Sequence, residues 1–141
     1  MNGDDWVLET LDPLQRRPAW ADRDGESACA RFLRAGRPLP EPHVDSPDLP
    51  ARAVADAGRL LYLAGAGPDA GCDRLVVDAV THADGELSVD ARVESEPGIS
   101  AQVITYPASL LWVPGVDADR ATATITDGWR RVHTVAALAN E

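Results

Sequence analysis

The chain has 141 residues, 45% of them hydrophobic, with 13 basic and 23 acidic residues and a formal net charge of -10. This length fits one domain whose core needs no metal or disulfide to be stable, and two cysteines are too few for a disulfide framework or a zinc ribbon. So acidic a chain is poorly suited to bind nucleic acid or an anionic membrane, because cationic side chains supply most of that affinity.

The first 56 residues predict little regular structure. Their prolines exclude long helices and central strands. A strand is expected to open at Trp6-Val7-Leu8. Ser27 to Ala35 forms either a short helix capped by Ser27 or a strand with Cys29, Arg31 and Leu33 on one face. Residues 37–50 are interpreted as an extended arm.

From residue 57 onward the pattern predicts strands. The apolar run 59–64 ends at glycines, as a buried strand does, and 75–81 is rich in β-branched residues. Strict alternation over 87–94 places Leu87, Val89, Ala91 and Val93 on one buried face. Asp84-Gly85 between these strands predicts a tight hairpin turn.

The last third of the chain continues the β pattern. Pro107 lies in the apolar run 102–113, which is therefore either an edge strand or two strands broken at a kink. Residues 121–126 alternate alanine or isoleucine with threonine. Asp127-Gly128 predicts a turn. The residues after it, 129–138, are expected to form a final strand or, toward their end, a frayed helix.

The spacing of these strands predicts a single domain that is mainly β. We expect a small antiparallel sandwich or barrel-like sheet over residues 57–141, preceded by an irregular Pro-rich N-terminal segment over residues 1–56. The chain lacks the alternation of strands and helices that parallel α/β folds require.

Short motifs between Leu60 and Trp129 carry a family resemblance. They are Leu60-Leu61-Tyr62-Leu63-Ala64-Gly65 leading to Gly71-Cys72-Asp73, then Glu96-Pro97-Gly98, Gln102-Val103-Ile104-Thr105-Tyr106-Pro107 leading to Leu110-Leu111-Trp112-Val113-Pro114, and Thr126-Asp127-Gly128-Trp129. This half of the chain resembles the C-terminal domain of the PrcB-type protease-complex accessory proteins, most closely the short haloarchaeal relatives.

The resemblance implies a β domain with a binding or stabilising role beside a protease. It carries over no catalytic residues. The chain departs from the family pattern at Ala70-Gly71-Cys72, where PrcB-type proteins usually have Gly-Gly-Tyr. It also has Ser100-Ala101 where haloarchaeal relatives often have a second cysteine, which excludes a disulfide from Cys72 to that position.

A catalytic site is not predicted, and Cys72 is the only weak candidate for a nucleophile. A reactive thiol needs a lowered pKa and a paired base. The three histidines, His43, His82 and His133, have no spacing that places one beside it or that holds a metal. The glycines of 65–71 lack the spacing and the following helix of a dinucleotide fingerprint, so no cofactor is expected.

A binding surface is the stronger prediction, with six residues as its candidates. They are Gly65, Gly67, Gly71, Cys72, Tyr106 and Trp112. Among the tryptophans, Trp112 and Trp129 are expected in the core, whereas Trp6 and Trp20 could anchor the arm onto the sheet or onto a second subunit.

Two functions remain open. The first is a non-enzymatic interaction domain, in which the 102–113 edge and the Pro-rich arm bind a protein partner or a second copy. The alternative is a small Cys-dependent hydrolase or ligand pocket around Cys72 and the loop 65–71. The acidity and the absence of lysine fit a salt-adapted surface, which we favour, or an acidic patch with a cationic partner.

The N-terminus shows no signal peptide, and no apolar run is long enough to cross a bilayer. We therefore expect a soluble cytoplasmic protein that does not insert into membranes. An extracytoplasmic location is expected instead if a leader has been removed.

Overall fold

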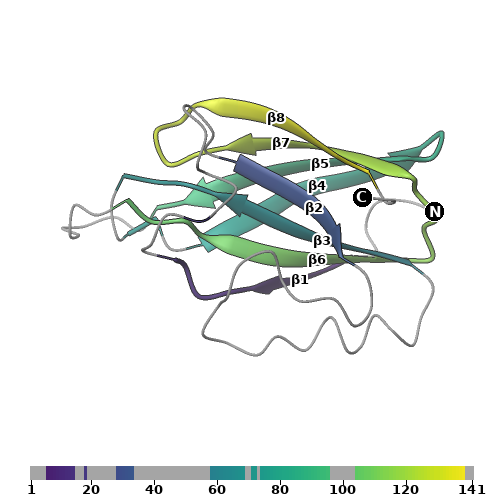
Figure 1. Ribbon diagram of the computed structural model, residues 1–141, viewed down its shortest axis with the longest axis horizontal. Coiled ribbons are helices and arrows are strands. Elements are labelled where there is room, and N and C mark those ends of the chain that lie inside the picture. Colours follow the sequence, from purple (N-terminus) through teal and green to yellow (C-terminus); the bar gives the residue numbers. More distant parts are fainter. Residues whose placement is uncertain are drawn as a thin grey trace.

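A computed structural model describes residues 6–14, 18, 28–33, 58–68, 71–72, 74–95 and 104–138. These residues form eight strands and no helix, which confirms the mainly β prediction (Figure 1). The strands are β1 (Val7–Thr10), β2 (Ala28–Leu33), β3 (Gly58–Gly65), β4 (Arg74–Ala83), β5 (Glu86–Glu94), β6 (Ala108–Pro114), β7 (Arg120–Thr126) and β8 (Val132–Leu138).

The strands build two four-stranded sheets. The first sheet has the order β1-β6-β3-β2 and the second β4-β5-β7-β8. Every neighbouring pair is antiparallel except β5 and β7, which run parallel. The two sheets do not close into a barrel, so the fold is a small sandwich.

The β4–β5 hairpin follows the sequence pattern closely. Asp84 and Gly85 both have positive φ, 54° and 75°, the conformation of a turn whose twist matches that of the flanking strands. Along β5 the side chains alternate between buried and exposed, with Leu87 and Val89 inside. The predicted turn and the predicted buried face are both confirmed.

The main core lies between the sheets, but the first sheet is apolar on its other face as well. Leu61 and Leu63 of β3 point into the main core, whereas Leu60 and Tyr62 belong to a second buried cluster. Because successive side chains of a strand point to opposite faces, β3 is buried on both sides. This explains its unbroken apolar run, which is typical of such a strand.

The prediction of an edge strand over 102–113 is wrong. Pro107 breaks the run: Thr105 and Tyr106 form isolated bridges before it, and β6 begins after it at Ala108. β6 lies between β1 and β3 and pairs with both. The alternative of two pieces separated at the proline agrees with this, although Gln102 and Val103 lie outside the described residues.

The first 56 residues contribute two strands to the first sheet. Ser27 to Ala35 contains a strand, β2, rather than a helix, and it pairs along its length with β3. The strand expected near Trp6 is β1, and the Trp6 side chain packs against the main core. The extended arm over 37–50 and Trp20 lie outside the described residues.

The two tryptophans expected in the core have different environments. Trp112 is buried, with 7% of its surface exposed, whereas Trp129 is 39% exposed, so the prediction for Trp129 is wrong. Trp129 lies in the turn between β7 and β8. After this turn the chain forms β8, and the alternative of a frayed helix toward Leu138 is also wrong.

Candidate functional site

The glycine-rich loop and Cys72 form one tightly packed unit. Gly67 exchanges backbone hydrogen bonds with Thr105, at N···O distances of 2.9 and 3.0 Å. A Cβ atom at Gly67 would lie 2.4 Å from the Cys72 Cβ, and one at Gly128 would lie 2.9 Å from the Cys72 Sγ. Contacts this short require glycine, so these glycines let three chain segments approach one another.

The Cys72 thiol is enclosed in this packing. Only 1% of the residue is exposed, and it belongs to the main core. His82 lies eight positions beyond Arg74 on β4, which at roughly 3.3 Å per residue places it about 26 Å along the strand from the end near Cys72. The structure therefore does not bring His82 to Cys72, and His43 lies outside the described residues.

The other two candidate residues lie on a different face. Tyr106 and Trp112 pack with Tyr62 in the cluster on the outer face of the first sheet, whereas Cys72 packs between the sheets. Gly67 thus packs directly on Cys72, which follows Gly71 in the chain, and Gly65 lies instead against Val93 and Leu75. Tyr106 and Trp112 form a separate group. The six candidates do not surround one cavity.

Asp127 organises the turn that leads into β8. Its side chain is buried and accepts hydrogen bonds from the backbone N–H groups of Trp129 (2.8 Å) and Arg131 (2.9 Å). Its second oxygen lies 2.7 Å from Nε2 of His133, the first inward-facing residue of β8. The carboxylate thus fixes both the turn and the start of the strand.

The hydrogen bonds of this turn determine which backbone groups of β8 are free for pairing. The Asp127 N–H donates to the Arg131 carbonyl at 2.9 Å. In an antiparallel ladder, hydrogen-bonded pairs alternate with pairs that are not bonded to each other. His133, Val135 and Ala137 therefore direct their N–H and C=O groups to β7.

The intervening residues of β8 direct their backbone N–H and C=O groups away from β7. These residues are Val132, Thr134, Ala136 and Leu138, and we call their outward N–H and C=O groups the free edge of β8. None of the described residues pairs with β8 on this side. Figure 1 shows β8 at one margin of the molecule, with β7 beside it.

Comparisons with family models, curated proteins and solved structures find no match. Among the described residues, no group of three or more His, Cys, Asp or Glu side chains is placed to hold a metal ion. That part of the chain also has no helix with the length and hydropathy to cross a membrane.

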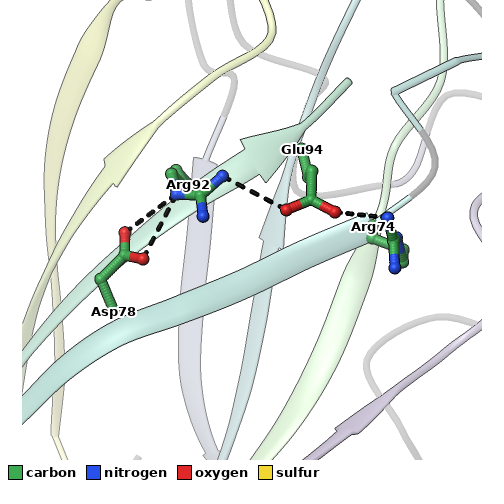
Figure 2. A network of polar contacts seen from close by, with 4 residues as sticks. All are labelled: Arg74, Asp78, Arg92 and Glu94. Atoms are coloured by element: carbon green, nitrogen blue, oxygen red, sulfur yellow. Dashed lines mark hydrogen bonds and ion pairs between the residues drawn. The ribbon is translucent and has the colours of Figure 1, made fainter. Parts of the chain in front are cut away.

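The opposite edge of the second sheet, β4, is protected against pairing. A bulge at Asp78 shifts the register with β5 between Val77 and Ala79. Asp78 binds Arg92 at 3.2 Å, and Arg92 and Arg74 both bind Glu94, which builds a chain of charges across β4 and β5 (Figure 2). Bulges and charged side chains are the features with which natural proteins keep edge strands from pairing.

The edges of the first sheet are less suitable than β8. β1 has only four residues and includes Glu9. β2 has six residues and exposes Arg31 near its middle. β8 has seven residues in continuous register with β7, and it contains no Asp, Glu, Lys, Arg or Pro. Among the described edge strands, β8 is therefore the one without a protective feature.

Sequence reasoning missed both Asp127 and the free edge of β8. An aspartate followed by glycine predicts a turn, but nothing in that pattern indicates a buried carboxylate that reaches His133. Whether a strand lies at an edge depends on which strands pair, and the sequence near β8 carries no record of that. The long uncharged stretch 132–138 was the one available signal.

Proposed function

We propose that this chain is a non-enzymatic interaction domain that binds a protein partner by strand addition at β8. The observation that carries the proposal is the free edge itself, whose N–H and C=O groups point away from β7 and belong to a strand without Asp, Glu, Lys, Arg or Pro. An extended segment that pairs there gains main-chain hydrogen bonds, and alternate side chains give specificity.

The side chains along this edge favour pairing. Val132 is 64% exposed and Leu138 47%, and both lie on the outer face at opposite ends of β8. An added strand would cover part of this apolar surface, which is favourable. Net contributions of about 0.5–1.5 kcal/mol per hydrogen bond make the backbone pairing a further source of affinity.

This proposal keeps the interaction function expected from the sequence but moves it from residues 102–113 to β8. The sequence leaves two classes of partner, the protease that the resemblance to PrcB-type proteins implies and a second copy of the chain. The Cys-dependent alternative is less favoured, because the Cys72 thiol is buried, His82 lies far along β4, and the His133 ring is bound to Asp127 at 2.7 Å.

Site-directed photocrosslinking tests the proposal. A crosslinking amino acid at Thr134 should capture a protein in extracts of cells that produce this chain, because Thr134 lies on the free edge. The matched control places it at Ser88, which is exposed on the same face of the sheet but lies on the interior strand β5. Strand addition predicts an adduct from Thr134 and none from Ser88.

Proline at position 136 provides the second arm of this test. Ala136 directs its N–H outward, so Ala136→Pro removes a donor from the free edge while the hydrogen bonds to β7 remain. The Thr134 adduct should then disappear. Equal capture from Thr134 and Ser88, or capture that survives Ala136→Pro, would show that the chain does not bind through this edge.

A further inference from the structure

We infer that the partner at the free edge of β8 is a second copy of the same chain, paired antiparallel about a twofold axis at Val135. This inference rests on the function proposed above and names the occupant of that edge. It would join two copies of the second sheet into one continuous eight-stranded sheet. A self-complementary interface of this kind is the commonest arrangement in soluble oligomers.

The hydrogen-bonding pattern of β8 permits this register. With Val135 on the axis, Val132 opposes Leu138 of the partner copy, and Thr134 opposes Ala136. All four residues direct their N–H and C=O groups outward. Each opposed pair can therefore exchange two hydrogen bonds, about eight in all. Val135 itself would form the non-hydrogen-bonded pair on the axis.

The side chains match in the same register. Val132 and Leu138 are the two exposed large hydrophobic residues of β8, and they lie three residues on either side of Val135. The axis therefore places Val132 of each copy beside Leu138 of the other copy, so the same apolar pair forms at both ends of the interface. Apolar pairs directly opposite each other stabilise neighbouring strands. All seven residues of β8 are paired only in this register.

The local charge also favours a second copy. The chain as a whole carries a net charge of -10, so most approaches of two copies bring negative surfaces together. β8 has no acidic residue, and Arg130 and Arg131 precede it. Arg120, which pairs with Leu138 from β7, is ion-paired with Glu86 at 3.4 Å. The edge is thus a neutral strip with arginines at its first end, on an acidic molecule.

Sedimentation velocity of the full chain, from about 1 μM to about 1 mM, tests this inference in dilute buffer and in molar salt. We expect the mass to rise from 15.0 kDa toward twice that value with concentration. The dissociation constant of the dimer should fall in molar salt, because the Debye length falls to about 3 Å and repulsion between the acidic copies is screened.

Three variants locate the interface. Ala136→Pro removes one hydrogen bond at each of two symmetric positions and should raise the dissociation constant at least about tenfold. Val132→Asp, which leaves the backbone unchanged, should do the same by placing a charge beside Leu138. Ile104→Asp is the control, because Ile104 is 48% exposed but lies outside β8. It should dimerise as the unaltered chain does.

A single cysteine tests the register. Val135→Cys places two thiols opposite each other only when Val135 lies on the axis, and the Cα separation of such a pair, about 4.5 Å, permits a disulfide. Thr134→Cys is the matched control, since its opposing residue is Ala136. Mild oxidation should give a covalent dimer from the first variant and not from the second.

A chain that stays monomeric at all concentrations in both buffers would overturn the inference, as would a dimer that Ala136→Pro and Val132→Asp both leave intact. If the monomeric chain still gives a Thr134 adduct with a different protein, strand addition stands and only the second copy fails. If that adduct is absent too, both proposals fail.

Discussion

A chain that begins at residue 57 is expected not to fold. β1 and β2 lie before this residue and supply half of the strands of the first sheet. Without them β3 loses its partner along Leu60 to Gly65, and β6 loses its partner along Ser109 to Trp112. Two long apolar strands, buried on both faces in the whole chain, would each present an unpaired edge to water.

The measurement is thermal unfolding of residues 57–141 followed by circular dichroism, beside the whole chain. The shortened chain should show no cooperative transition, or aggregate, and a separate peptide of residues 1–56 should restore part of the transition. A fragment that unfolds cooperatively at the melting temperature of the whole chain would show that residues 57–141 are an independent core.

Replacing Asp127 is expected to cost about 3 kcal/mol of stability, near the upper end for a point substitution. The side chain is 2% exposed and accepts three hydrogen bonds. Asp127→Ala would leave the Trp129 and Arg131 N–H groups and the His133 ring without this acceptor in a partly buried turn. Asp127→Asn keeps one acceptor oxygen and should cost less.

Urea unfolding of both variants and of the unaltered chain measures these differences. The expected order of stability is unaltered chain, then Asp127→Asn, then Asp127→Ala. Because the turn holds the start of β8, Asp127→Ala should also weaken dimer formation. If both variants lie within about 0.5 kcal/mol of the unaltered chain, a range typical of inert surface substitutions, the carboxylate does not hold the turn.

Features that depend on neighbouring residues could be predicted from the sequence. The alternation along β5 follows from the period of two in a strand with one buried face. The turn at Asp84 and Gly85 follows because both residues adopt a positive φ more readily than most others. In each case the physical cause lies within a few residues of the feature.

Features that depend on distant pairing could not be predicted. Pro107 indicated an edge, but the proline lies opposite Gly65 at the end of the β3–β6 ladder. Its carbonyl accepts a hydrogen bond from the Gly65 N–H (3.0 Å), so its missing N–H costs the ladder only one terminal hydrogen bond. The parallel pair of β5 and β7 brings together strands separated by all of β6. No local pattern records either fact.

The candidate site was mispredicted for the same reason. Gly67 and Cys72 attracted attention as parts of a loop motif, yet their short contacts show that they serve packing. Trp129 was expected inside because indoles dominate small cores, but it occupies a turn that the Asp127 carboxylate shapes. The edge position of β8 became visible only with the strand order of the second sheet.

Residue-resolved hydrogen exchange along β8, in dilute monomeric solution, tests the central claim most directly. The free edge predicts alternating protection: the amides of His133 and Val135, bonded to β7, exchange slowly, and those of Thr134 and Ala136 exchange rapidly. At high concentration the latter two should become protected. Equal protection of Thr134, Val135 and Ala136 in dilute solution would mean that the edge is already covered, and would contradict the account.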